Sequence, residues 1–175
     1  TGIESAAMIR GRIMDQYLDL PTEFISIYFN LMSQKYFQNY QKLGLASARM
    51  NRLNVFDWIH GETTLFSEEL VPFKVPTGCT LASVEGTPHD QRLYKRGEIL
   101  AYLKYDEDEN RLLYVNYLRK GKIWKRDWFG LKGRIYRTDY VDPHYETPDP
   151  VVEMFWGHTG HLAMIRDYEF SADKK

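Results

Sequence analysis

The hydrophobic and polar positions follow two different rhythms along the 175-residue chain. Up to about residue 66, helical spacing of apolar residues alternates with short apolar runs. Pro21 closes the first helical segment and Gly44 the second. The rhythm predicts a helix at 3–17, a strand at 23–30, a helix at 33–43 and a short element at 49–59. The strand is apolar enough to be buried on both faces, as in a doubly wound α/β unit.

From about Val71 the apolar residues alternate with polar ones at a period of two. Turn signals separate the runs, and Lys120-Gly121 is a typical two-residue hairpin turn. The predicted strands are 79–84, 91–96, 99–105, 111–118, 122–128, 133–140, 150–156 and 161–168. We therefore predict α/β plus antiparallel β: a partial Rossmann-like segment in 1–66 whose first strand is missing, then an antiparallel β-meander domain in 67–175.

Composition narrows the class of protein. With 43% apolar and 27% charged residues, the chain is neither collagen-like nor disordered. No apolar run approaches the roughly 20 residues of a membrane-spanning helix, and no signal peptide opens the sequence. A single cysteine, Cys79, excludes an internal disulfide and fits a reducing, cytoplasmic compartment. Because the chain starts at Thr1 without an initiator Met, we expect it to be a piece of a larger protein.

The formal net charge of −1 hides a basic strip. Residues 119–141 hold eight basic side chains against two acids, interleaved with aromatic residues. The strip predicts a surface that binds an acceptor or a partner, formed by Arg119, Lys122, Trp124, Lys125, Arg126, Trp128 and Arg134. If the stretch is a strand, Trp124, Arg126 and Trp128 share one face. The alternative is that the aromatic rings cover the core and the arginines extend past them.

No catalytic constellation stands out in the sequence. It holds no P-loop lysine, no nucleophile elbow and no HExxH motif. His158 and His161 flank a predicted hairpin tip, which favours surface histidines over a metal site, so no metal is expected.

A helix opening at Thr1-Gly2-Ile3 offers free N–H groups and a positive dipole end, which favour an anion such as a diphosphate.

Several segments resemble retaining family 4 glycosyltransferases of Gram-positive bacteria. TGIESAAMIRGRIM and DQYLDLPTEFISIYF resemble the family's opening, with Gly2 in a loop, Arg10 eight positions later and Phe24-Ile25 in the next strand. MNRLNVFDWI corresponds to the entry into an inserted antiparallel sheet, and NYLRKGKIWKRDWF and GRIYRTDY to its middle strands. The branch in question includes the wall-teichoic-acid α-glycosyltransferases and the accessory Sec system glycosyltransferase that modifies serine-rich adhesins.

The resemblance implies a GT-B fold and a UDP-sugar donor bound between two Rossmann-like domains. It places Thr1, Gly2 and Ile3 at the donor diphosphate. It also puts the catalytic residues in a second domain that lies outside this chain. The chain by itself is then expected to bind no cofactor and to be inactive. The implied reaction transfers glucose or N-acetylglucosamine to a cell-wall polymer or a serine-rich surface protein. The implied partners are further copies of the chain or a partner glycosyltransferase subunit.

The residues themselves are also compatible with a function other than catalysis. The chain could be a non-enzymatic carbohydrate-binding or protein-interaction β module, with residues 1–66 as scaffold. Nucleic-acid binding is disfavoured, because the net charge is −1 and Asp106–Glu109 forms an acidic cluster. The absence of a spanning segment is compatible with peripheral association with a membrane.

Overall fold

The computed structural model describes residues 2–61, 69–106, 111–144 and 149–168. The chain divides into two compact units, Thr1–Trp58 and Ile59–Lys175. The domain boundary expected between residues 66 and 67 lies outside the described residues. None of the described helices has the length and apolarity that crossing a bilayer requires.

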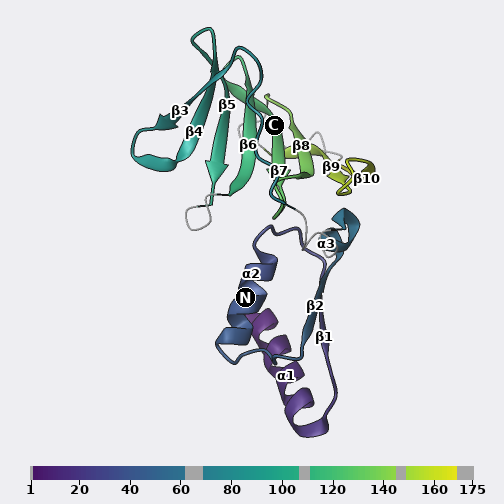
Figure 1. Ribbon diagram of the computed structural model, residues 1–175. Helices are drawn as coiled ribbons and strands as arrows, with labels where there is room; N and C mark the ends of the chain where they lie inside the picture. The colour runs from purple at the N-terminus through teal and green to yellow at the C-terminus, as the bar shows by residue number, and fades with distance from the viewer. Residues whose placement is uncertain (1, 62–68, 107–110, 145–148, 169–175) are drawn as a thin grey trace. The chain divides into compact units, whose positions relative to one another are not determined.

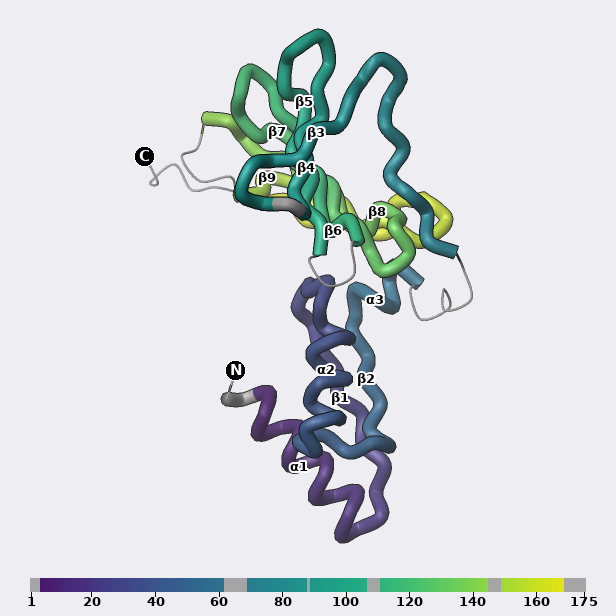
Figure 2. Tube along the Cα trace, turned by 60° about the vertical axis from the view of Figure 1, so that its left-hand side comes forward, coloured from purple at the N-terminus to yellow at the C-terminus, as the bar shows by residue number. Residues whose placement is uncertain are grey.

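The first unit contains two parallel strands with two helices on one side of them (Figures 1 and 2). Its elements are α1 (Gly2–Leu18), β1 (Glu23–Ser26), α2 (Ser33–Lys42), β2 (Asn51–Asn54) and the beginning of α3 (Val55–His60). Glu23 pairs with Asn51 and Ser26 with Asn54 in a parallel ladder. The predicted helix–strand–helix order and the short element after it are confirmed. Assignment to a wider Rossmann-like domain stays a prediction.

The core of this unit lies between the helices and one face of β1. Met8 of α1 and Phe37 of α2 are buried, and Phe24 of β1 stacks on Phe37 with ring centroids 6.4 Å apart. Ile25 points the other way and is 59% exposed. The expectation of a strand buried on both faces is therefore wrong for the described residues, because the two helices cover the same face.

The second unit is an eight-stranded antiparallel meander in which each strand pairs with its neighbours in sequence (Figure 1). Its strands are β3 (Thr80–Val84), β4 (Thr87–Lys95), β5 (Glu98–Tyr105), β6 (Leu112–Arg119), β7 (Lys122–Phe129), β8 (Ile135–Val141), β9 (Pro150–Trp156) and β10 (Leu162–Asp167). All eight predicted strands are confirmed. The Lys120-Gly121 turn has positive φ at both residues, 51° and 76°, as a two-residue hairpin turn requires.

One face of this sheet carries the apolar core and is called the core face below. Leu93, Leu103 and Val115 lie in its middle, each no more than 3% exposed, and Phe129 closes one end. The segment from 70 to 79 packs on this face, because the Phe73 ring contacts the Phe129 ring edge-on at 6.4 Å. Val71 N–H donates to the Lys132 carbonyl at 2.8 Å and ties the segment to the turn before β8.

Gly133 tests how much this attachment contributes to stability. A Cβ at Gly133 would lie 2.1 Å from the Val71 carbonyl oxygen, and its φ of 72° also disfavours other residues. We expect Gly133→Ala to lower the free energy of unfolding by about 2–3 kcal/mol, measured by urea denaturation. Gly121→Ala is the matched control, since φ is 76° there but a Cβ meets nothing within 4 Å; its loss should be about 1 kcal/mol. Equal losses would show that the close contact with Val71 is unimportant.

Candidate binding surface

The face opposite the core face is polar, and two rows of side chains run across it from β4 to β10. Residues in a row are cross-strand partners, and the rows are two residues apart on every strand, so all these side chains project from the same face. We call this surface the polar face. Its first row is Arg92, Tyr102, Asn116, Arg126, Asp139, Glu153 and Arg166, and its second is Asp90, Lys104, Tyr114, Trp128, Arg137, Phe155 and Met164.

A buried charge cluster occupies the β8–β10 side of the polar face. The Arg137 guanidinium lies 2.8 Å from Asp139 and 3.0 Å from Glu153, and these two carboxylates are only 3% and 5% exposed. Arg166 from β10 also reaches Glu153, at 3.1 Å. Burial raises the pKa of Asp139 above its ordinary value, although Arg137 and the Trp128 indole N–H act in the opposite direction. Arg137 thus offsets part of the cost of burying the Asp139 carboxylate.

Aromatic rings and guanidinium groups alternate along the rows. Arg137 lies over the rings of Trp128 and Phe155, at 5.0 and 5.9 Å from their centroids. Arg126 lies over Trp128 and Tyr114, at 5.2 and 5.3 Å. The Trp128 indole N–H donates to Asp139 at 2.7 Å. Because cation–π contacts and hydrogen bonds fix both kinds of group, the polar face is a preorganised surface of donors and ring faces.

Of the predicted binding residues, Arg126 and Trp128 lie together on the polar face, but Trp124 does not. The register of β6 and β7 shifts between Tyr117 and Leu118, which leaves Trp124 as the extra residue of a β-bulge. Its ring packs 6.1 Å from that of Tyr140, which belongs to the core face. The expectation that Trp124 shares the face of Arg126 is therefore wrong, because a bulge reverses the alternation of side chains.

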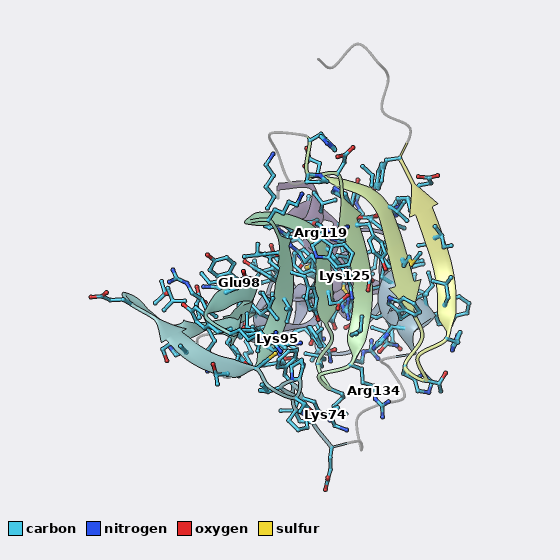
Figure 3. The ribbon with its side chains drawn as sticks, turned by 90° about the horizontal axis from the view of Figure 1, so that it is seen from above. Lys74, Lys95, Glu98, Arg119, Lys125 and Arg134 are labelled. Carbon is cyan, nitrogen blue, oxygen red and sulfur yellow. The ribbon has the colours of Figure 1, made fainter. Side chains whose placement is uncertain are left out.

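The remaining predicted residues are scattered. Lys125 projects from the core face, where it pairs with the buried Asp127 at 2.9 Å and lies over the Tyr117 ring. Arg119 and Lys122 belong to the hairpin at one end of β7, and Arg134 lies beyond the other end, where it donates to the His158 carbonyl. Figure 3 shows Arg119 and Arg134 at opposite ends of the strands, with Lys125 between them. The basic strip of the sequence is thus not one continuous basic surface.

The predicted donor loop lies at the edge of what the structure describes. Thr1 is outside the described residues, and α1 begins at Gly2, as the helix-start pattern indicates. A contact of Gly2 or Ile3 with a diphosphate stays a prediction. Elsewhere in the first unit, a cavity of about 490 Å³ lies over β1 between α1 and α2. Arg52 lines this cavity, but its guanidinium forms an ion pair with Asp57 and donates a hydrogen bond to the Ser33 hydroxyl. Its charge is therefore already compensated within the first unit.

Of the first row, sequence reasoning found only Arg126; on strands β4–β6 it missed Arg92, Tyr102 and Asn116. They lie outside the basic strip, on strands whose charges are mixed. Counting back from the hairpin turns would not have found them, because register shifts in both hairpins decide that Arg126 pairs with Asn116 and Asn116 with Tyr102. As for metals, no group of three or more His, Cys, Asp or Glu side chains with metal-binding geometry exists among the residues that the structure covers.

No family model matches the sequence, and no curated protein matches it either. Several solved structures match the fold. Over 91% of this chain, the structure resembles a Gap123 glycosylation-associated protein complex from Streptococcus agalactiae, with a TM-score of 0.65 and 18% identity. It also resembles a complex of accessory secretory proteins 1, 2 and 3 from Streptococcus pneumoniae, with a TM-score of 0.64 and 14% identity over 89% of the chain.

A third match is the pneumococcal O-GlcNAc transferase GtfA, solved with UDP and GlcNAc. Here the TM-score is 0.61 and the identity 15%, over 97% of this chain. The matched part is 30%, 30% and 33% of the three solved chains, so this chain spans about a third of their length. The likeness shows that both units belong to a fold found within glycosyltransferase structures.

Glu153 tests whether the charge cluster holds the polar face in shape. It accepts from Arg137, Arg166 and the Tyr168 hydroxyl. Because Gln cannot accept from all three, we expect Glu153→Gln to lower the free energy of unfolding by on the order of 1–3 kcal/mol in urea denaturation. Asp167→Asn, an exposed acid of β10, is the control with the same charge change and should stay within about 0.5 kcal/mol of the parent. A Glu153→Gln variant as stable as this control would contradict the role given to the cluster.

Proposed function

We propose that the chain is the amino-terminal part of a glycosyltransferase that transfers glucose or N-acetylglucosamine from a UDP-sugar to an acceptor. The support is the fold, which over 91% and 97% of the chain resembles proteins named for glycosylation, one of them solved with UDP and GlcNAc. In this proposal residues 1–66 are a partial Rossmann-like segment and residues 67–175 an inserted β-domain. The catalytic residues belong to a part of the protein outside this chain, so the chain alone is inactive.

In this proposal the donor lies against the start of α1. The first turn of a helix presents N–H groups with no partner inside the helix, and its dipole favours a diphosphate. Gly2 allows the backbone to approach the phosphates closely because it has no side chain. Thr1 and Ile3 flank it. The UDP-sugar is a substrate, and no cofactor is part of the proposal.

The acceptor is proposed to bind on the polar face, and this face is the observation that carries the functional assignment of the β-domain. It combines fixed donors with half-buried aromatic rings such as Trp128, which suits a polar ligand with hydroxyl groups. Of the two acceptors that the family resemblance implies, a protein fits better than a teichoic-acid polymer. A polyanion needs a continuous basic surface, and the cations of the basic strip are divided between two faces and two strand ends.

Association with another subunit is proposed to involve the sheet edges. Within the described part of the chain, the outer strands β3 and β10 each pair on one side only, which leaves backbone donors and acceptors available for a further strand. On β10, Ile165 is 53% exposed. Two of the similar structures are complexes of several proteins. The proposed partner is a second copy of the chain or a partner glycosyltransferase subunit.

Gly2→Val in the full-length gene product tests the proposed donor site. A side chain at this position would push the diphosphate away from the helix, and a displacement of about 1 Å can cost roughly 100-fold in rate. We expect transfer of labelled GlcNAc or glucose from UDP-sugar to fall about 100-fold, with unchanged stability. Ala7→Val, exposed in the same helix, is the matched control and should keep full activity.

The assay also separates the two classes of function. A serine-rich protein and poly(glycerol phosphate) are supplied as alternative acceptors with each UDP-sugar. Transfer to neither acceptor, together with sugar binding by the purified protein, would overturn the enzyme and favour a carbohydrate-binding module. Transfer to poly(glycerol phosphate) alone would overturn the choice of a protein acceptor.

A further inference from the structure

The cavity between α1 and α2 in the first unit has the size and the lining of a small-molecule site. Its volume is about 490 Å³, and ligand pockets span roughly 300–1,000 Å³. Phe24 and Ser26 of β1 form its floor, while Met8 of α1 and Tyr40 of α2 line its two sides. Aromatic rings contribute much of the lining, as they do in ligand pockets generally. These residues all belong to one compact unit.

The cavity reaches the carboxyl end of β1. Tyr28 and Asn30 follow this strand, and Ser33 begins α2. Glu4 lies in the first turn of α1 and also lines the cavity. In open α/β sheets, ligands bind in the crevice outside the carboxyl ends of the strands. The position of the cavity therefore points to a ligand independently of its volume.

The α2 side of the cavity offers hydrogen-bonding groups that the fold does not use. Tyr36, Asn39 and Tyr40 are three and four positions apart, so they lie on one side of the helix, and all three line the cavity. Within the described part of the chain, no hydrogen bond engages the hydroxyls of Tyr28, Tyr36 and Tyr40 or the side-chain amide of Asn39. Each of these groups can donate and accept. The cavity thus combines aromatic rings with uncommitted polar groups.

The charges around the cavity favour an uncharged ligand. Arg52 is the only cation among the described lining residues, and it is already paired with Asp57 and bonded to Ser33. A phosphate or a carboxylate would therefore meet no uncommitted cation. The Glu4 carboxylate can accept hydrogen bonds from ligand hydroxyls. An aliphatic chain, in contrast, would offer no partner to the tyrosine hydroxyls or to the Asn39 amide.

We propose that this cavity binds one neutral sugar ring, with Tyr36 and Asn39 as its main contacts. A pyranose has apolar C–H faces and a rim of hydroxyls, so it can pack on an aromatic ring and form hydrogen bonds at the same time. Tyr36 is 52% exposed, which makes its ring accessible to a ligand. The inference goes beyond the proposed function, because this site requires neither UDP nor the polar face.

Binding of methyl glycosides to the full-length gene product tests the proposal. The probes are the methyl β-glycosides of N-acetylglucosamine and glucose, titrated with and without saturating UDP and followed by saturation-transfer NMR. Cyclohexanol, an apolar ring with one hydroxyl, is the reference ligand. Because each additional hydrogen bond strengthens binding, we expect at least one glycoside to bind about tenfold more tightly than cyclohexanol. Saturating UDP should leave this affinity unchanged, which separates the site from one that holds the sugar of the donor.

Three variants locate the binding. Tyr36→Ala removes a ring and a hydroxyl and should weaken glycoside binding by about tenfold. Tyr36→Phe and Asn39→Ala each remove polar atoms only and should weaken it by about threefold. Tyr17→Ala is the matched control, because Tyr17 is 79% exposed on α1 and does not line the cavity; it should keep the full affinity. Urea denaturation checks that each variant is folded.

The outcomes separate this inference from the proposed function. Failure of both glycosides to bind, cyclohexanol binding as tight as theirs, or equal effects of Tyr36→Ala and Tyr17→Ala would overturn the sugar site even if sugar transfer is observed. Displacement of the glycoside by UDP would also overturn it and assign the bound sugar to the donor. Glycoside binding that depends on Tyr36, without any sugar transfer, would support the site and count against the enzyme.

Discussion

Alternation of side chains in an uninterrupted register divides the β3–β10 sheet into two chemically different faces. Seven strands stay in register through the two rows of the polar face, while the register shifts lie at the strand ends. Because the side-chain period in a strand is two, a slip of one residue would exchange Val115 with Asn116 and put a polar group into the core. The core face and the polar face therefore depend on the same constraint.

The burial of two acidic side chains on the polar face has an unfavourable free energy that other interactions must offset. Asp139 and Glu153 are nearly inaccessible to solvent, and removing such groups from water is unfavourable unless they are paired and hydrogen-bonded. Arg137 meets both carboxylates and also stacks on Trp128, which fixes the ring. Arg137 and Arg166 pair with these acids on the β8–β10 side, whereas no ion pair joins Arg92 or Arg126 to an acid among the described residues.

The two units differ in the groups that they present. The first unit has two parallel strands and a helix that begins at Gly2. The second unit has donors and aromatic rings that cation–π contacts and hydrogen bonds hold in place. The fold of the two units resembles about a third of each of these similar solved chains.

The sequence by itself determined the order and the type of nearly all elements, because periodicity and turn residues such as Lys120-Gly121 act locally. It also determined that Arg126 and Trp128 share a face, since both follow the β7 bulge. Tertiary structure alone decided the side of Trp124, because a bulge depends on the pairing of two strands. It likewise decided that Arg92 and Arg126 belong to one row, since residues 34 positions apart share a row only when four strands pair in register.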